Sequence, residues 1–359
     1  MNNKVLLAMS GGMDSSISIK ILQDKGYEVH GITFILWKQY RANNQIINND
    51  LQYVTNAQNV AKAFNISHIV MDLTDYFNEK VICPFVNTYL NGHTPNPCVV
   101  CNKHVKFKVL HDKAQELDCD YISTGHYANV KHNNEKYYIS KGIDSLKDQS
   151  YVLWALPQQY LSKIIFPLGN MNKSTQTKEL VKQYGIQEFI CQKESFDICF
   201  VPDNNYQNVL LIHKEDELSK LNNGEIILNN KVIGYHKGYP FYTIGQRKNL
   251  GVAVGYPVYV KNIDKTNNRV IVSDNNGLLL DQLVISNVNM MKYEKFDEDK
   301  IYTVKIRYHD KGTSAKVKYF IEDSSKVIIN FQSPVRAITP GQSAVIYEND
   351  DVVGGGIIQ

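Results

Sequence analysis

A glycine-rich turn near the start of the chain, Ser10-Gly11-Gly12-Met13-Asp14-Ser15, constrains the fold more than any other feature. It follows a short apolar run, Val5 to Met9, that is typical of a buried parallel strand. It precedes residues 17–25, whose apolar side chains recur at helical spacing, and Gly26 is a typical residue to end that helix. A helix N-terminus after such a turn presents backbone N–H groups to an anion, and the helix dipole favours negative charge there. We therefore predict a phosphate-binding loop at residues 8–15.

This loop differs from the commonest nucleotide-binding loop, because no Lys follows its glycines as in GxxxxGK[ST]. An isolated Ser-Gly-Gly turn is usually only a connection between elements. Here a predicted strand precedes the glycines, and Asp14, Ser15 and Ser16 follow them at the spacing of a phosphate-binding loop. That combination favours phosphate binding.

The composition sets wide limits on the class of protein. A length of 359 residues predicts two or three domains, and 43% hydrophobic with 21% charged residues is ordinary for a globular protein. Because neither a signal peptide nor a long apolar run is evident, we expect a cytoplasmic protein without a membrane span. A formal net charge of +3 does not predict nucleic-acid binding by itself, and the basic cluster at 103–108 is typical of a solvated helix face.

The first half of the chain alternates predicted strands and helices, which indicates an α/β fold with a doubly wound parallel sheet. After the first strand and helix, we predict strands at 28–35, 68–71 and 121–126 and helices at 54–64 and 106–117. An Asn-rich polar stretch at 40–50 follows the strand at 28–35. After Pro202 short strands separated by turns predict a small antiparallel barrel, with examples at 225–228, 231–236, 302–308 and 326–331. We expect a catalytic domain over 1–203, a β-rich connector over 204–280 and a β-barrel over 281–359.

Six cysteines are present: Cys83, Cys98, Cys101, Cys119, Cys191 and Cys199. In a reducing compartment they do not form a disulfide framework. Cys119 has the surroundings of a structural cysteine, and nothing near Cys83 or Cys191 argues for reactivity. Cys199, taken alone, is typical of a buried strand cysteine.

Cys98 and Cys101 form a CxxC motif. A structural zinc site needs four ligands, and no second CxxC or His pair is evident, so zinc is weakly supported. A reactive thiol is the stronger interpretation, because Cys101 directly precedes a predicted helix and Lys103 and Lys106 are near it in sequence. Both features favour thiolate and lower the pKa of a thiol from about 8.5 by roughly a unit or more.

A series of motifs, in the same order along nearly the whole chain, resembles the bacterial tRNA-specific 2-thiouridylases, a family of PP-loop ATPases. The matching segments are 10–15, Asn96-Pro97 with Cys101-Asn102, 124–128, 147–151, 195–200, 234–236, 242–247 with Gly251, 307–308 and 340–342. Each motif alone could arise by chance, whereas their common order is specific. The resemblance implies a transferase that replaces the C2 oxygen of the wobble uridine of tRNA, U34, with sulfur and converts ATP to AMP and pyrophosphate.

The resemblance also implies roles for individual residues. ATP binding is implied for the loop and for two positions beyond it: Ala8, Met9, Ser10, Gly11, Gly12, Met13, Asp14, Ser15, Phe34 and Gly125. Cys101 would be the nucleophile, Cys199 would carry the transferable persulfide, and Asn96, Pro97 and Cys98 would lie against the target base. Contacts with tRNA are implied for residues in both halves of the chain: His126, Lys147, Asp148, Gln149, Arg307, Tyr308 and Gln342.

Partners and cofactors follow from the same resemblance. It implies ATP with Mg²⁺, the Lys, Glu and Gln tRNAs as substrates, and an upstream protein that donates persulfide sulfur. One position departs from the family pattern, because Cys98 stands where many members have Asp, which puts the role of that Asp in doubt here. Cys98, Cys101 and Cys199 also resemble the three-thiolate set of iron–sulfur-dependent tRNA thiolases, so a [4Fe–4S] cluster is an alternative to a persulfide relay. No other metal site is assigned.

The expected chemistry starts with attack of the uridine O2 on the α-phosphate of ATP, after which AMP leaves readily. The persulfide sulfur then attacks C2 directly, or Cys101 attacks the persulfide of Cys199 and releases hydrosulfide, leaving a disulfide. Two other functions stay open. Another PP-loop enzyme, such as an amidotransferase or synthetase, would not need the cysteines. An RNA-binding protein or sulfur carrier would have a vestigial loop, against which the retained Asp14 and both glycines count.

Overall fold

The computed structural model describes residues 3–38, 51–133, 135–185, 198–201, 204–323 and 325–359. Predictions for the stretch 40–50, for Cys191, for residues 195–197 and for a domain boundary at 203 therefore lie outside the described residues. The chain divides into two compact units, each assembled from separate segments. The first unit comprises Met1–Val81, Cys98–Phe196 and Asp350–Val352; the second comprises Ile82–Pro97, Asp197–Asn349 and Val353–Gln359.

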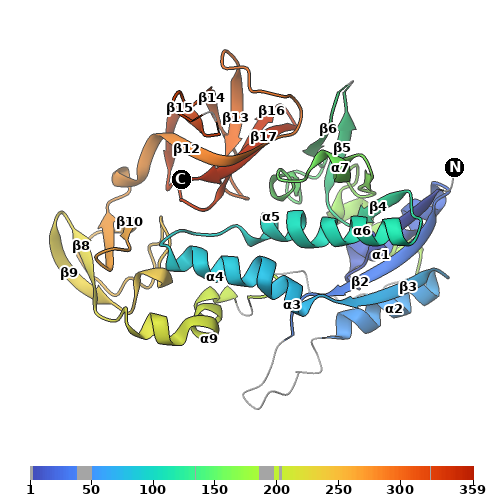
Figure 1. Ribbon diagram of the computed structural model, residues 1–359, viewed down its shortest axis with the longest axis horizontal. Helices are drawn as coiled ribbons and strands as arrows, with labels where there is room; N and C mark the ends of the chain where they lie inside the picture. The colour runs from blue at the N-terminus through green and yellow to red at the C-terminus, as the bar shows by residue number, and fades with distance from the viewer. Residues whose placement is uncertain (1–2, 39–50, 134, 186–197, 202–203, 324) are drawn as a thin grey trace. The chain divides into compact units, whose positions relative to one another are not determined.

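A five-stranded parallel sheet forms the centre of the first unit, with strand order β3-β2-β1-β4-β7. Its strands are β1 (Lys4–Ala8), β2 (Glu28–Ile35), β3 (Ser67–Asp72), β4 (Tyr121–Thr124) and β7 (Ile164–Ile165). The chain passes from β1 to β2 on one side and later places β4 on the other side of β1. Such a reversal opens a crevice at the carboxyl ends of the two strands. The doubly wound sheet predicted from the sequence is confirmed (Figure 1).

Helices of the first unit bury apolar faces against this sheet. Ile19 and Leu22 of α1 (Met13–Asp24) pack with Val60 of α2 (Gln52–Ala63) and with side chains of β1 and β2 in one buried cluster. Gly26 ends α1 with φ +83°, as its sequence position predicted. The remaining elements of this unit are α3 (Thr74–Phe77), η2 (Asn78–Ile82), α5 (Pro97–Cys101), η3 (Asn102–Lys106), α6 (Phe107–Glu116), β5 (Ala128–His132), β6 (Tyr137–Lys141), η4 (Ser150–Val152), α7 (Gln158–Leu161), η5 (Lys173–Thr177) and α8 (Lys178–Gln183).

The second unit contains a four-stranded sheet of order β10-β11-β8-β9. Its strands are β8 (Gly224–Leu228), β9 (Lys231–His236), β10 (Tyr259–Asp264) and β11 (Arg269–Ser273). Asn229 and Asn230 join β8 to β9 with positive φ angles of 51° and 62°, which matches the two-residue hairpin turn that Asn tolerates. Other elements of this unit are α4 (Cys83–Leu90), α9 (Tyr206–Ser219), η8 (Tyr239–Phe241) and η9 (Asn276–Leu278).

The second unit also contains a closed antiparallel barrel. Its strands are β12 (Leu279–Met290), β13 (Ile301–Lys305), β14 (Thr313–Tyr319), β15 (Val327–Arg336), β16 (Ser343–Glu348) and β17 (Asp351–Ile358). They follow the order β12-β15-β14-β13-β16-β17, and pairing of β12 with β17 closes the barrel. Alternate side chains fill its core, among them Val304, Val317 and Ile329. The C-terminal barrel predicted from the short strands is confirmed.

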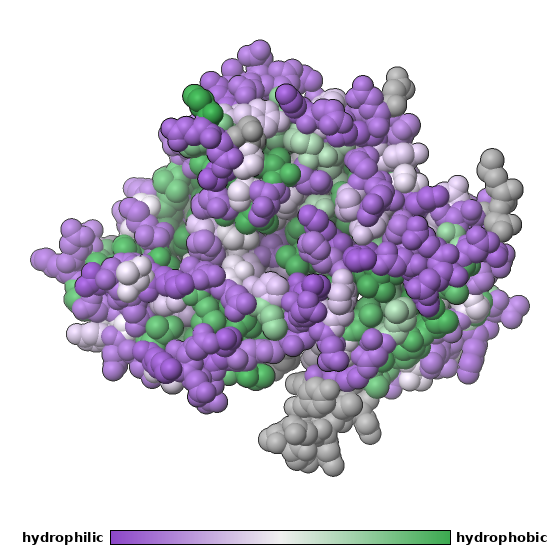
Figure 2. Space-filling view, viewed as in Figure 1, coloured by the Kyte–Doolittle hydropathy of each residue, from purple (hydrophilic) through white to green (hydrophobic). Residues whose placement is uncertain are grey.

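Exposed large hydrophobic side chains occur on several separate elements, as Leu146, Ile212 and Ile321 illustrate. The face displayed in Figure 2 is accordingly covered largely by hydrophilic residues, with hydrophobic ones between them. Within the part of the chain that the structure describes, no helix combines the length and apolarity needed to cross a membrane.

Candidate active site

The predicted phosphate loop is built by short-range hydrogen bonds. The Ser10 N–H donates to Ser15 Oγ over 3.2 Å, and Ser15 Oγ donates to the Gly12 carbonyl over 3.1 Å. The first intrahelical bond of α1 runs from the Ser16 N–H to the Gly12 carbonyl. The N–H groups of residues 13–15 precede this bond and have no carbonyl one turn earlier to accept from them. The loop therefore offers backbone donors and a helix N-terminus to an anion at the carboxyl end of β1.

Two glycines allow this loop to lie close to its neighbours. Gly11 has φ +67°, and a Cβ there would lie 2.3 Å from the Tyr53 carbonyl oxygen. A Cβ on Gly125, directly after β4, would lie 3.1 Å from the Ser15 nitrogen. The structure thus places Gly125 against the loop. Phe34, at the end of β2, is 9% exposed, and its carbonyl accepts the Tyr53 hydroxyl at 3.2 Å.

Two side chains from distant parts of the first unit hold the Asp14 carboxylate. The Tyr127 hydroxyl donates to Asp14 Oδ1 at 2.8 Å, and Lys173 Nζ donates to Asp14 Oδ2 at 2.9 Å. Burial, together with the negative charge of Asp14, raises the pKa of Tyr127 well above its usual value, so this hydroxyl stays protonated and donates. No sequence pattern indicated Lys173, because it lies 159 positions from Asp14 in a polar segment.

The His126 side chain is half-buried and packs among side chains of the first unit. Its Nδ1 lies 2.7 Å from Thr124 Oγ1, and its ring packs against Phe107 and Phe166. Burial, with a smaller effect of Lys106, lowers the pKa of His126 to about 3. The imidazole is therefore neutral at physiological pH, and His126 offers no cation to RNA; a neutral contact stays a prediction.

The helix that carries the CxxC motif begins earlier than the sequence analysis predicted. α5 begins at Pro97, a residue favoured in the first helical position, and the π-helical turn η3 connects it to α6. The expectation that Cys101 precedes the helix is therefore wrong, and the helix-dipole argument applies to Cys98 in the first turn. Cys101 lies in the second turn, 5% exposed, on the same helical face as the half-buried Cys98.

The segment that leads into this helix is held by the barrel, and all of these contacts lie inside the second unit. Gln342 Nε2 donates to the carbonyls of Thr94 and Pro95, at 3.3 and 2.7 Å. Asn96 Nδ2 donates to Ser343 Oγ at 3.5 Å. Gln342, expected to contact tRNA, thus uses its amide to fix the chain just before the predicted target-base residues. A tRNA contact by Gln342 stays a prediction.

Cys199 belongs to the second unit, where it lies in an exposed turn. The interpretation as a buried strand cysteine is therefore wrong, whereas its neighbour Phe200 is buried against Phe85 at a ring distance of 5.1 Å. None of the five described cysteines forms a disulfide. Among the residues outside the gaps in the description, no group of three or more His, Cys, Asp and Glu is arranged to hold a metal ion.

The other residues expected to contact tRNA fall into two kinds. The Asp148 carboxylate accepts from the Gly142 and Ser150 N–H groups, so it shapes its own loop. Gln149 Oε1 accepts from the Tyr127 N–H at 2.9 Å. A partner can reach the other three residues. Lys147 is half-buried in the same loop, and the exposed Arg307 and half-buried Tyr308 follow β13.

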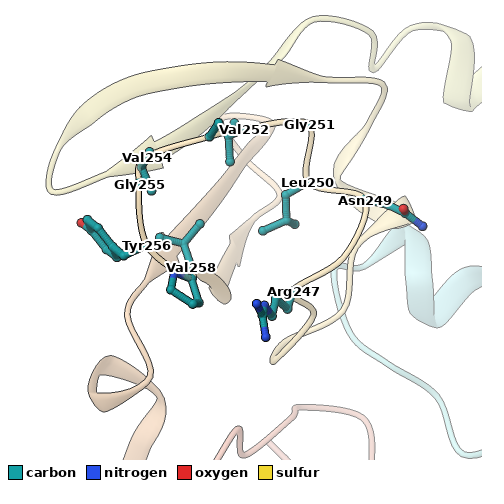
Figure 3. Close-up of a pocket in the computed structure, with 11 residues that line it drawn as sticks. Arg247, Asn249, Leu250, Gly251, Val252, Val254, Gly255, Tyr256 and Val258 are labelled. Atoms are coloured by element: carbon teal, nitrogen blue, oxygen red, sulfur yellow. The ribbon is translucent and has the colours of Figure 1, made fainter.

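A surface hollow of about 610 Å³ lies in the four-stranded-sheet region of the second unit, lined by Arg247 and residues 249–258. Figure 3 shows the loop that surrounds it, with Tyr256 at its outer side. Leu250 and Val258 are buried in the core of this region, whereas Tyr256 is 50% exposed. Arg247, the last residue of the matching segment 242–247, and Gly251 therefore line this hollow.

Three family models match consecutive parts of the chain. They are described as a tRNA methyl transferase HUP domain over residues 3–203, a tRNA methyl transferase PRC-barrel domain over 215–274 and an aminomethyltransferase beta-barrel domain over 280–358. The first model covers the parallel sheet and its phosphate loop, and the third covers the barrel. Together they define a multidomain protein of the tRNA-modifying class.

Curated relatives match over almost their whole length. The tRNA-specific 2-thiouridylase MnmA of Amoebophilus asiaticus (strain 5a2) is 41% identical over 99% of this chain and 95% of its own. The protein of the same name from Cytophaga hutchinsonii is 42% identical over 99% and 97%, and MnmA 2 of Thermoanaerobacter sp. (strain X514) is 42% identical over 100% and 98%. The chain belongs to the tRNA-specific 2-thiouridylase family.

Proposed function

We propose that this protein is an ATP-dependent sulfurtransferase that converts the wobble uridine of tRNA, U34, to 2-thiouridine. The likeness over full length to relatives named tRNA-specific 2-thiouridylase carries this proposal. The phosphate loop at the carboxyl end of β1 supports it, because the loop has the backbone donors that a nucleotide phosphate needs.

ATP binds with its phosphates at residues 8–15 in this proposal, and with Phe34 and Gly125 beside the nucleoside. The uridine O2 attacks the α-phosphorus, the bond from that phosphorus to the bridging oxygen breaks, and pyrophosphate leaves. The loop donors compensate the charge that develops on the departing group. Mg²⁺ neutralises phosphate charge when it accompanies ATP. Asp14 is already engaged by Lys173 and Tyr127, so the described residues do not form a ready metal site and no step is assigned to the metal.

Sulfur arrives as a persulfide on Cys199, whose exposure in a turn suits loading by a donor protein. In one route the terminal sulfur attacks C2 and AMP leaves, after which Cys101 attacks the Cys199 sulfur and releases the thiolated base. In the other, Cys101 attacks first and releases hydrosulfide, which then displaces AMP from C2. Both routes end in a Cys101–Cys199 disulfide, which a two-electron reductant such as a dithiol must reopen.

A persulfide relay is preferred over a [4Fe–4S] cluster. A cluster held by the protein alone uses four cysteines, and three could hold one only with an open iron position. Cys98 and Cys101 belong to the first unit and Cys199 to the second, so no cluster ligand set is assigned and no step is derived through a cluster. Cys98 is then a residue at the target base, together with Asn96 and Pro97.

The test is reconstitution of thiolation with the full chain, ATP, a persulfide-loaded donor and unmodified Lys, Glu or Gln tRNA. Wild type should form 2-thiouridine, seen by mercury-gel retardation, and should release pyrophosphate only when tRNA is present. Cys101→Ser and Cys199→Ser should each reduce product by at least about 10³-fold. Cys83→Ser, which replaces another exposed cysteine, should act like wild type. Thiolation that survives both serine variants, or pyrophosphate release without tRNA, would refute the proposal.

Iron and acid-labile sulfide analysis of anaerobically purified protein separates the two sulfur chemistries. The relay predicts iron far below one atom per chain together with full activity. Stoichiometric iron and sulfide that are lost with activity in Cys98→Ser would replace the relay with a cluster.

A further inference from the structure

The Asp14 carboxylate opposes the binding of phosphate at this loop, because its negative charge repels the phosphates. Lys173 and Tyr127 resolve this, since an ammonium and a hydroxyl each donate to one carboxylate oxygen. Lys173 is well placed for this role, because its side chain is only 14% exposed and its bond is 2.9 Å long. The orientation of the Asp14 carboxylate, and the compensation of its negative charge, therefore depend on where these two residues are held.

Lys173 is held from the loop at residues 142–149. The Lys173 N–H donates to Asp144 Oδ2 at 2.9 Å, and Asp144 itself is only 6% exposed. The same carboxylate accepts the Leu146 N–H at 3.1 Å, and the Asp144 carbonyl accepts the Lys147 N–H at 3.0 Å. Asp144 thus connects the fold of this loop directly to the backbone of Lys173.

Tyr127 is held from the other end of the same loop. Gln149 Oε1 accepts the Tyr127 N–H, and the Gln149 N–H donates to the Tyr127 carbonyl, both at 2.9 Å. Each end of the loop is therefore bonded to one of the two residues that hold Asp14. All of these contacts lie within the first unit.

The middle of the loop is exposed to solvent and partly apolar. The side chains of Ile143 and Leu146 are 60% and 87% exposed, and Lys147 follows them directly. Exposed apolar side chains beside a lysine suit a partner with flat bases and phosphates, such as an RNA loop. A partner that covers them stabilises the same segment that positions Lys173 and Tyr127.

We propose that Lys173 and Tyr127 are positioning residues that couple the loop at 142–149 to Asp14, so that RNA bound on this loop tightens the binding of ATP. This inference rests on the proposed function, because it takes tRNA and ATP as the two ligands. RNA bound on the loop stabilises the arrangement in which Lys173 contacts Asp14, and so keeps the phosphate loop free of an uncompensated carboxylate. By linkage, ATP tightens RNA binding by the same factor.

The coupling is measured as the ratio of two dissociation constants for α,β-methylene-ATP, without and with saturating unmodified Lys tRNA, by calorimetry on the full chain. Wild type should give a ratio of at least about five. Asp144→Asn keeps one oxygen to accept from Leu146 but loses the acceptor for the Lys173 N–H, so its ratio should fall to near one. Lys173→Met should do the same and should also weaken ATP binding without tRNA. Lys178→Met, which replaces an exposed lysine of α8, should keep the wild-type ratio.

A wild-type ratio near one, or a ratio that stays at the wild-type value in Asp144→Asn, overturns the inference. Circular dichroism checks that each variant is folded. If Lys173→Met does not give the spectrum of wild type, the result for Asp144→Asn alone decides. The thiolation assay on the same preparations keeps the two proposals apart. Product formation with a ratio of one removes the coupling alone, whereas absence of product from wild type removes the proposed function.

Discussion

The phosphate loop and the segment that enters the cysteine helix both precede a helix N-terminus, yet they are fixed in different ways. Hydrogen bonds within the phosphate loop join residues three to five positions apart, such as Ser15 to Gly12 and Ser10 to Ser15. The segment at 94–96 instead depends on Gln342 and Ser343, about 250 positions later in the sequence. The hydrogen bonds that shape the first structure join its own residues, whereas those that hold the second come from a folded barrel.

This difference predicts that mutations can affect ATP binding and the step at the target base independently. A change inside the phosphate loop should alter ATP binding, and a change at the barrel contact should alter the step that involves the target base. Two variants test that separation, and a third tests a pH dependence of stability beside the phosphate loop; they follow in order of decreasing effect.

The largest effect is expected for Gly11→Ala. The new Cβ would meet the Tyr53 carbonyl oxygen at 2.3 Å, and φ +67° strains any residue with a Cβ. We expect ATP affinity to fall on the order of 100-fold, or about 2.7 kcal/mol, in equilibrium binding. Gly26→Ala is the matched control, because it shares a positive φ but has no atom within 4 Å of its Cβ. Equal ATP affinity in the two variants would contradict a requirement for a glycine with close packing at position 11.

An intermediate effect is expected for Gln342→Leu. It removes both donors to the Thr94 and Pro95 carbonyls, each worth about 1 kcal/mol, while leaving the phosphate loop intact. The turnover number for thiolation should fall about tenfold, with ATP affinity unchanged. Gln282→Leu, which loses an exposed bond to Asn330 on the barrel, should behave like wild type. An effect confined to the KM for tRNA would instead assign Gln342 to direct tRNA contact.

The smallest effect is a pH dependence of stability from His126. Its folded-state pKa of about 3 lies below the unfolded value of about 6.5, so between these values only the unfolded state binds the proton. Stability therefore falls as the pH drops below 6.5, by about 1 kcal/mol between pH 6.5 and 5.5. Denaturant unfolding of wild type and His126→Gln at the two pH values measures it.

The His126→Gln variant should lose less stability than wild type over this interval. His309→Gln, at an exposed position of the second unit, should keep the wild-type dependence. If all three proteins respond equally, the acid sensitivity does not arise beside the phosphate loop.

Local sequence signals predicted what local forces determine. The strand at 28–35 has the predicted bounds, and Asn229 and Asn230 form the predicted turn, because alternation and turn chemistry act over a few residues. The phosphate loop belongs to the same category. Its glycines, its serines and the end of α1 at Gly26 all appear in one stretch of sequence.

Features that depend on distant residues could not be predicted in this way. Lys173 reaches Asp14, and Gln342 reaches Pro95, only after the sheet and the barrel have formed. The start of the cysteine helix was missed for another reason. Apolar spacing becomes regular only from Val105, whereas the first helical residue is Pro97, whose restricted φ is itself a signal for a helix start.

Strand β17 has a consequence for dissecting the molecule. Asp350 and Asp351 bind Lys141 and Lys131 in the first unit, whereas the chain from Val353 onward pairs with β12 in the second. Each unit is therefore assembled from three segments that alternate along the polypeptide with segments of the other unit. No single cut can release either unit whole, so gene fragments that divide the chain at one site should give material that misfolds unless the pieces are produced together.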